Sequence, residues 1–147
     1  MQLDGMILTK CPPEQVVQLL LTPDAVRKLL PEGCEVGERK GDTVPFVILR
    51  RVGPIKLSMA GTLTLTPAAD GQAYELVIQA SHIVAGRVRV AMELMPDTQT
   101  GRSKRLRWNG NLDAHGLAAR LVEGRRKRVR GAIENLFIGL RDQIEWA

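Results

Sequence analysis

The sequence predicts one α+β domain, in which a long C-terminal helix lies across the concave side of a curved antiparallel sheet. Residues 34–113 read almost wholly as β-strand, with turn residues at the spacing of antiparallel meanders. The segment 116–146 contains no proline and repeats apolar residues at helical spacing. A helix of that length must bury its apolar stripe against a sheet. The stripe comprises Ala118, Val122, Val129, Ile133, Leu136, Leu140 and Ile144.

The other elements are predicted in order from their boundary residues. Residues 2–9 alternate weakly and form a first strand, after which Pro12 and Pro13 begin a short helix, since proline is tolerated in a first helical turn. Thr22 is a candidate N-cap for a second short helix, which Pro31 ends. We expect six further strands, at residues 34–39, 43–51, 55–66, 72–82, 87–95 and 102–113.

Alternation within these strands predicts a sheet with one buried and one solvated face. Four apolar residues of strand 55–66 share a face, as do four of strand 87–95, whereas arginine alternates with apolar residues in strand 102–113. The apolar residues are Leu57, Met59, Leu63 and Leu65, then Val88, Val90, Met92 and Leu94.

Length and composition indicate an ordinary globular protein. The chain of 147 residues fits a single domain over residues 1–147. No apolar run reaches membrane-spanning length and the first residues do not resemble a signal peptide, so we expect a cytoplasmic protein. Peripheral attachment to the inner face of the membrane stays open. Cys11 and Cys34 are too few for a disulfide framework and lack the partners of a zinc site.

Positive charge is concentrated in one segment. Residues 102–130 hold 10 of the 21 Lys and Arg residues and two acids, so the segment carries +8 and the remainder of the chain −3. Such a segment attracts anionic lipid, nucleic acid or an acidic protein. Proteins that bind single strands stack bases on aromatic side chains, and this chain has five aromatic residues. We therefore rank nucleic-acid binding through residues 102–130 below binding to anionic lipid or to an acidic protein.

Several short motifs follow one another in a recognisable order. They are Cys11-Pro12-Pro13-Glu14-Gln15-Val16, Leu21-Thr22-Pro23-Asp24, Leu30-Pro31-Glu32-Gly33-Cys34-Glu35, Val52-Gly53-Pro54-Ile55 with Gly61 downstream, and Gly116-Leu117-Ala118-Ala119-Arg120-Leu121. This series resembles the CoxG family of carbon monoxide dehydrogenase subunits, a branch of the Bet v 1-like/START (SRPBCC) superfamily. The resemblance covers nearly the whole chain.

The resemblance implies a helix-grip fold, in which a seven-stranded antiparallel sheet surrounds the C-terminal helix and two short helices follow the first strand. It also implies non-enzymatic binding of a lipophilic small molecule, lipid-like or quinone-like, between sheet and helix. In the family's named members it implies an accessory role beside a molybdenum hydroxylase such as carbon monoxide dehydrogenase, including recruitment of that enzyme to the membrane. A cyclase- or hydrolase-type enzyme on the same fold is the alternative.

Candidate ligand-binding residues are those that this arrangement turns inward. Core filling is the ordinary role of such residues, and cavity lining is the alternative, since methionine adapts to irregular apolar ligands. No catalytic or cofactor motif is visible, and we expect neither a cofactor nor a metal. The candidates are Phe46, Met59, Met92, Trp108, Leu121, Arg125, Val129 and Phe137.

A basic cluster interrupts the apolar stripe of the long helix. Arg125 and Arg126 project to either side of the stripe and Lys127 points away from it. Either the arginine stems cover apolar surface while their heads reach water, or Arg125 binds the polar head of a ligand. We expect Arg126, Lys127, Arg128 and Arg130 to form a patch that faces an anionic membrane or an acidic partner. The roles of His82 and His115 stay open, although Asp113 and His115 would share a face if their strand continued.

Overall fold

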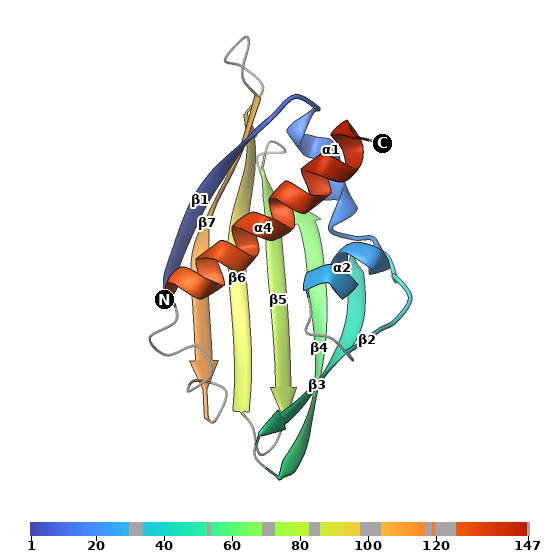
Figure 1. Cartoon of the computed structure of the whole chain (residues 1–147), viewed down its shortest axis with the longest axis vertical. Helices are drawn as coiled ribbons and strands as arrows, with labels where there is room; N and C mark the ends of the chain where they lie inside the picture. The colour runs from blue at the N-terminus through green and yellow to red at the C-terminus, as the bar shows by residue number, and fades with distance from the viewer. Residues whose placement is uncertain are drawn as a thin grey trace.

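The computed structural model of the chain shows a seven-stranded antiparallel sheet with helices on one side (Figure 1). It describes residues 1–29, 34–52, 54–68, 73–82, 86–97, 104–116, 119 and 126–146. In chain order the elements are β1 (Gln2–Thr9), α1 (Pro13–Leu19), α2 (Pro23–Leu29), β2 (Glu35–Val36), β3 (Thr43–Val52), β4 (Ile55–Pro67), β5 (Tyr74–His82), β6 (Gly86–Asp97), β7 (Lys104–His115) and α4 (Arg126–Glu145).

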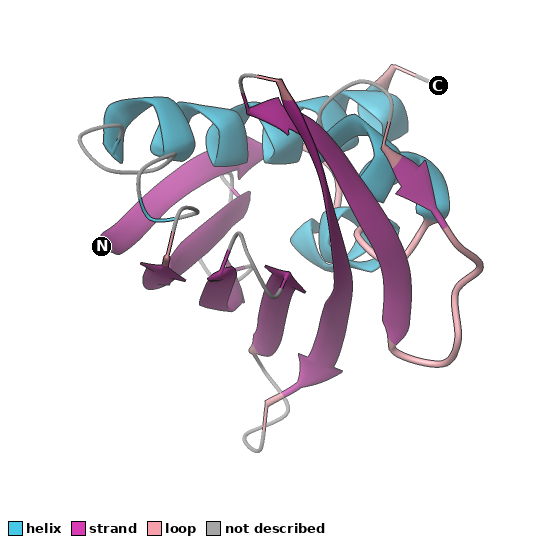
Figure 2. Cartoon of the chain, turned by 90° about the horizontal axis from the view of Figure 1, so that it is seen from below, coloured by secondary structure: helices cyan, strands magenta, loops and turns pink. Residues whose placement is uncertain are grey.

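The sheet order is β1-β7-β6-β5-β4-β3-β2, so the first strand pairs with the last and every other neighbour is consecutive. Seen along the strands, the sheet curves around α4, and α1 and α2 lie on the same side (Figure 2). Both short helices and β1 contact α4. The seven strands, the two short helices and the C-terminal helix are those that the sequence predicts.

Alternating burial along the strands confirms that one face of the sheet is buried. Met59, Leu63 and Leu65 of β4 are buried, and Met92 and Leu94 of β6 are as well. We call the face that carries these side chains the inner face, and the opposite one the outer face. The inner face forms one core with apolar residues of α1, α2 and α4.

The second predicted strand, residues 34–39, is shorter in the structure. Strand β2 covers Glu35–Val36, which pair with Val47 and Phe46. Gly37 still donates its backbone N–H to the carbonyl of Pro45 at 2.8 Å. Because Pro45 has no N–H, it cannot donate the second hydrogen bond of the pair back to the carbonyl of Gly37. The strand therefore ends at this point.

The start of the predicted C-terminal helix lies largely outside the described residues. The described helix begins at Arg126, and Ala119 is also helical, but residues 117–118 and 120–125 are not described. Among the described residues, no helix combines the length and apolar character needed to cross a membrane.

Candidate functional site

Five of the predicted ligand-binding residues gather between the inner face and α4. Phe46 lies on β3, Met59 on β4, Met92 on β6 and Trp108 on β7, and all four are buried in the core that Phe137 of α4 completes. Antiparallel pairing places them together, because residues of one parity along each strand point to the same face. The structure thus brings five predicted site residues into one cluster, and the four on strands were assigned from alternation within those strands.

Trp108 and Phe137 form the aromatic centre of this cluster. Their ring centroids are 4.7 Å apart with an interplanar angle of 33°. The indole packs tightly on β1, because a Cβ at Gly5 would come within 2.3 Å of its ring. The indole Nε1 is buried and has no hydrogen-bond partner. A buried N–H without a partner costs free energy, so this group is a donor available to a polar ligand atom.

One part of the inner face is only partly covered. Val88 and Val90 of β6, Ile78 of β5 and Ala114 of β7 point inward but are partly exposed, although they pack against the core. They are cross-strand neighbours, since Val90 faces Ile78 and Val88 faces Ala114. Val129 of α4, a predicted site residue, is likewise half-buried against the core. These residues form a continuous apolar surface inside the curve of the sheet, which we call the inner apolar surface.

Three further predicted residues lie wholly or partly outside the part of the chain that the structure describes. Leu121 and Arg125 lie outside the described residues, and only the backbone of Arg126 is described. Their assignment to a ligand or a patch stays a prediction. The other patch residues, Lys127, Arg128 and Arg130, are on α4, and all three are exposed.

The basic segment 102–130 is divided between two sides of the molecule. Arg107 is exposed on the outer face of β7, whereas Lys127, Arg128 and Arg130 belong to α4, which lies on the inner side of the sheet (Figure 2). Asp113 and His115 do share a face, because β7 continues to His115 and both side chains are exposed on its outer side. Among the described residues, Thr9 is the buried polar side chain, and its hydroxyl has no hydrogen-bond partner.

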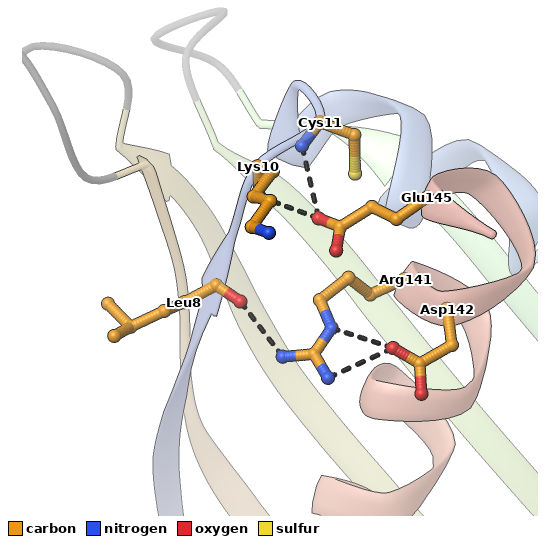
Figure 3. A network of polar contacts seen from close by, with 6 residues as sticks. All are labelled: Leu8, Lys10, Cys11, Arg141, Asp142 and Glu145. Atoms are coloured by element: carbon orange, nitrogen blue, oxygen red, sulfur yellow. Dashed lines mark hydrogen bonds and ion pairs between the residues drawn. The ribbon is translucent and has the colours of Figure 1, made fainter.

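The C-terminal end of α4 is tied to the junction between β1 and α1 by a polar network that the sequence did not indicate (Figure 3). Glu145 Oε1 accepts the backbone N–H groups of Lys10 at 2.6 Å and Cys11 at 3.1 Å. Arg141 Nη1 donates to the carbonyl of Leu8 at 3.0 Å. The Lys10 N–H lowers the pKa of Glu145, while burial, followed by the charge of Glu145, raises the pKa of the Cys11 thiol.

Comparison with known families agrees with this architecture. The sequence profile of the carbon monoxide dehydrogenase CoxG subunit matches residues 5–145, which is nearly the whole chain. The chain belongs to the CoxG family. The resemblance drawn from the short motifs is therefore confirmed. No curated protein is significantly similar to the chain by sequence comparison.

Solved structures show the same fold at low sequence identity. A conserved protein from Geobacillus kaustophilus is 16% identical, with a TM-score of 0.63, over 97% of this chain and 91% of that one. The Zhui aromatase/cyclase from Streptomyces sp. R1128 is 13% identical, with a TM-score of 0.61, over 97% and 94%. The STAR-related lipid transfer protein from Xanthomonas axonopodis (fragment 25–204) is 16% identical, with a TM-score of 0.58, over 94% and 84%.

These likenesses confirm the helix-grip (Bet v 1-like/START) fold that the sequence predicted. Together with the family assignment they support a fold that binds hydrophobic ligands.

Proposed function

We propose that this CoxG-family protein binds a lipophilic small molecule, lipid-like or quinone-like, between the inner face of the sheet and α4. The observation that carries the proposal is the inner apolar surface, where Ile78, Val88, Val90 and Ala114 point inward yet are partly exposed. Apolar area left in contact with water costs about 25 cal/mol per Å², so an apolar ligand that covers it gains that free energy. Binding sites of this kind are mostly apolar with a few placed polar groups.

The aromatic centre supplies the polar group that such a site needs. Trp108 borders the same core and its buried Nε1 has no partner. A ligand carbonyl that reached this N–H would satisfy it, and the net gain from such a hydrogen bond is about 1 kcal/mol. This feature favours a quinone or ester head over a plain hydrocarbon.

The most direct test is native mass spectrometry of the purified protein, followed by organic extraction. A co-purifying lipid or quinone would support the proposal, and a protein that is empty in repeated preparations would contradict it. Because the chain has two tryptophans, Trp146→Phe leaves Trp108 as the single tryptophan fluorophore. Addition of decyl-ubiquinone to this variant should then quench its emission saturably.

A matched pair of variants locates the ligand. Val90→Phe fills the inner apolar surface and should weaken decyl-ubiquinone binding at least tenfold. Val77→Phe places the same side chain on the outer face of the neighbouring strand, because Val77 has the opposite parity to Ile78. Equal affinity of the two variants would place the quinone elsewhere and contradict the site.

We further propose that the protein recruits a molybdenum hydroxylase such as carbon monoxide dehydrogenase to an anionic membrane surface. Family membership supports the enzyme partner, and the basic residues Lys127, Arg128 and Arg130 on α4 support the membrane contact. Near an anionic surface each such charge contributes about 1 kcal/mol. Replacing all three by Gln should therefore weaken binding to phosphatidylglycerol vesicles roughly a hundredfold.

The control removes the same charge from elsewhere on the surface. Arg39, Lys56 and Arg107 are exposed and lie outside α4. Their triple Gln variant should keep most of the vesicle affinity. If both triple variants lose affinity equally, net charge rather than the α4 patch drives the contact. Co-purification of the hydroxylase with the wild-type chain tests the enzyme partner separately.

A further inference from the structure

The outer face of the sheet, on the side away from α4, carries two adjoining hollows. They lie close to Gly86, the first residue of β6. Their volumes are about 620 and 730 Å³, and both are lined by Ala60, Ser81, Arg87 and His115. Volumes of this size are those of small-molecule sites. The hollows lie on the opposite face of the sheet from the inner apolar surface, and Val88, whose side chain points inward, is the residue that both share. A ligand site here therefore does not depend on the proposed hydrophobic-ligand function.

The hollows are built by two cross-strand rows of outward side chains. In the first row Thr62 faces Gln79, Gln79 faces Arg89, and Arg89 faces Asp113. In the second row Ala60 faces Ser81, Ser81 faces Arg87, and Arg87 faces His115. The side chains contributed by β4 are short and those contributed by β6 are long. This difference in length leaves the surface beside the two arginines hollow. We call the two hollows together the outer-face groove.

Within the described residues, neither Arg87 nor Arg89 takes part in an ion pair, although Asp113 stands opposite Arg89. Both arginines are exposed and project from the same side of one strand, two residues apart. Two guanidinium groups held side by side repel each other and attract an anion placed between them.

Acidic side chains of the outer face gather in one row across the sheet. Glu75 faces Glu93 directly, Glu93 faces Asn109, and Asn109 faces Asp4, so an acidic row crosses the sheet further along β6. Like charges directly opposite each other destabilise a sheet. Along β6 this acidic row lies apart from Arg87 and Arg89, so the outer-face groove is the part of that strand's outer side that attracts an anion.

We propose that the outer-face groove binds a soluble phosphate ester, with the phosphate held between Arg87 and Arg89. A phosphate monoester presents three terminal oxygens, enough for two guanidinium forks, whereas a carboxylate presents two. The hydroxyls of Thr62 and Ser81 and the amide of Gln79 line the same groove and donate hydrogen bonds to the remaining oxygens or to hydroxyls of the ester. Asp113 accepts hydrogen bonds from such hydroxyls.

The test is a titration of the ¹⁵N-labelled protein with glycerol 3-phosphate at constant ionic strength, set against sodium chloride. We expect saturable shifts at the backbone amides of residues 79–81, 87–89 and 113–115. The double variant R87Q/R89Q should bind at least tenfold more weakly. R107Q, which removes an exposed arginine of the same face outside the groove, should bind like the wild type.

A second variant keeps the test valid if R87Q/R89Q folds poorly. Ala60→Trp leaves both arginines in place and fills the hollow that they border, so it should also abolish saturable binding. Shifts that grow linearly and appear equally around residues 127–130 would show non-specific screening and overturn the proposal. Loss of phosphatidylglycerol vesicle binding in R87Q/R89Q, with glycerol 3-phosphate unbound by the wild type, would overturn the assignment to a soluble ligand.

Discussion

Replacing Glu145 should loosen the C-terminal end of α4 from the junction between β1 and α1 (Figure 3). One carboxylate oxygen accepts two backbone N–H groups, at 2.6 and 3.1 Å, from residues 135 and 134 positions earlier in the chain. The contact therefore joins the two ends of the sequence. The junction has no other cap from its own residues, since Pro12 makes no side-chain hydrogen bond at the start of α1.

The size of the expected stability loss follows from the number of hydrogen bonds that Glu145 accepts and from their exposure to solvent. A hydrogen bond to a charged group contributes about 1.5–3 kcal/mol, but the Lys10 N–H is exposed and the Cys11 N–H only partly buried. Discounting for solvent, we expect Glu145→Ala to lower the free energy of unfolding by about 2 kcal/mol. Glu145→Gln keeps a neutral acceptor and should lose about half of that. For a domain of this size, 2 kcal/mol lowers Tm by roughly 4–8 °C.

The pH dependence of the stability loss identifies the Glu145 contact more specifically than the size of that loss does. Folding lowers the pKa of Glu145 below its ordinary value of 4.5, chiefly through the Lys10 N–H. Its contribution is therefore complete above the unfolded pKa and disappears as the pH falls through the lower folded one. The stability difference between wild type and Glu145→Gln should be constant from pH 8 to about 5.5 and shrink below about 4.5.

Urea denaturation followed by circular dichroism measures both quantities. Glu134→Gln is the matched control, because Glu134 is exposed on the same helix and forms no ion pair with a described residue. Amide exchange should also accelerate at Lys10 and Cys11 in the Glu145 variants. If Glu145→Ala is as stable as Glu134→Gln, or if the difference is the same at pH 3 and pH 7, the contact does not hold the helix end.

Three further predictions concern single positions. Gly61→Ala should cost about 1–3 kcal/mol in urea denaturation, because a Cβ there would lie 2.4 Å from the Gln79 carbonyl and 2.7 Å from the Phe46 ring. Gly139→Ala should instead stabilise by about 0.5–1 kcal/mol, since its Cβ would meet nothing within 4 Å and Ala favours a helix; a loss of stability there would contradict this. Cys11 should react with iodoacetamide more slowly than a free thiol at pH 8, because burial and Glu145 raise its pKa, and Glu145→Gln should partly restore the rate; an unchanged rate would show that the carboxylate does not act on the thiol.

Periodicity predicted most of the fold because it reports which side chains avoid water. Met59, Met92 and Trp108 could be assigned to one interior from alternation within their strands, and the structure buries all three. The short β2 could not be foreseen in the same way, since the sequence around Gly37 does not reveal that the Pro45 opposite it withholds an N–H.

The long-range contacts were beyond sequence reasoning. Glu145 and Lys10 lie 135 residues apart, and neither residue type announces a contact with the other. The outer-face groove likewise depends on register, because Arg87, Ser81 and Ala60 align only once three strands are paired. The alternation of arginine with apolar residues in β6 could have drawn attention to Arg87 and Arg89, but nothing in the sequence places small side chains beside them.

The two proposed sites share strand β6 but use opposite faces of it. Val88 and Val90 point to the inner apolar surface, while Arg87 and Arg89 point to the outer-face groove. Because successive side chains of a strand point to opposite faces, a substitution at Arg89 leaves Val90 directed inward. In the same way, a substitution at Val90 leaves Arg89 directed outward. Quinone binding by R87Q/R89Q and phosphate-ester binding by Val90→Phe should therefore each match the wild type. Loss of both activities in either variant would mean that β6 itself had been displaced and that the two faces cannot be assigned separately.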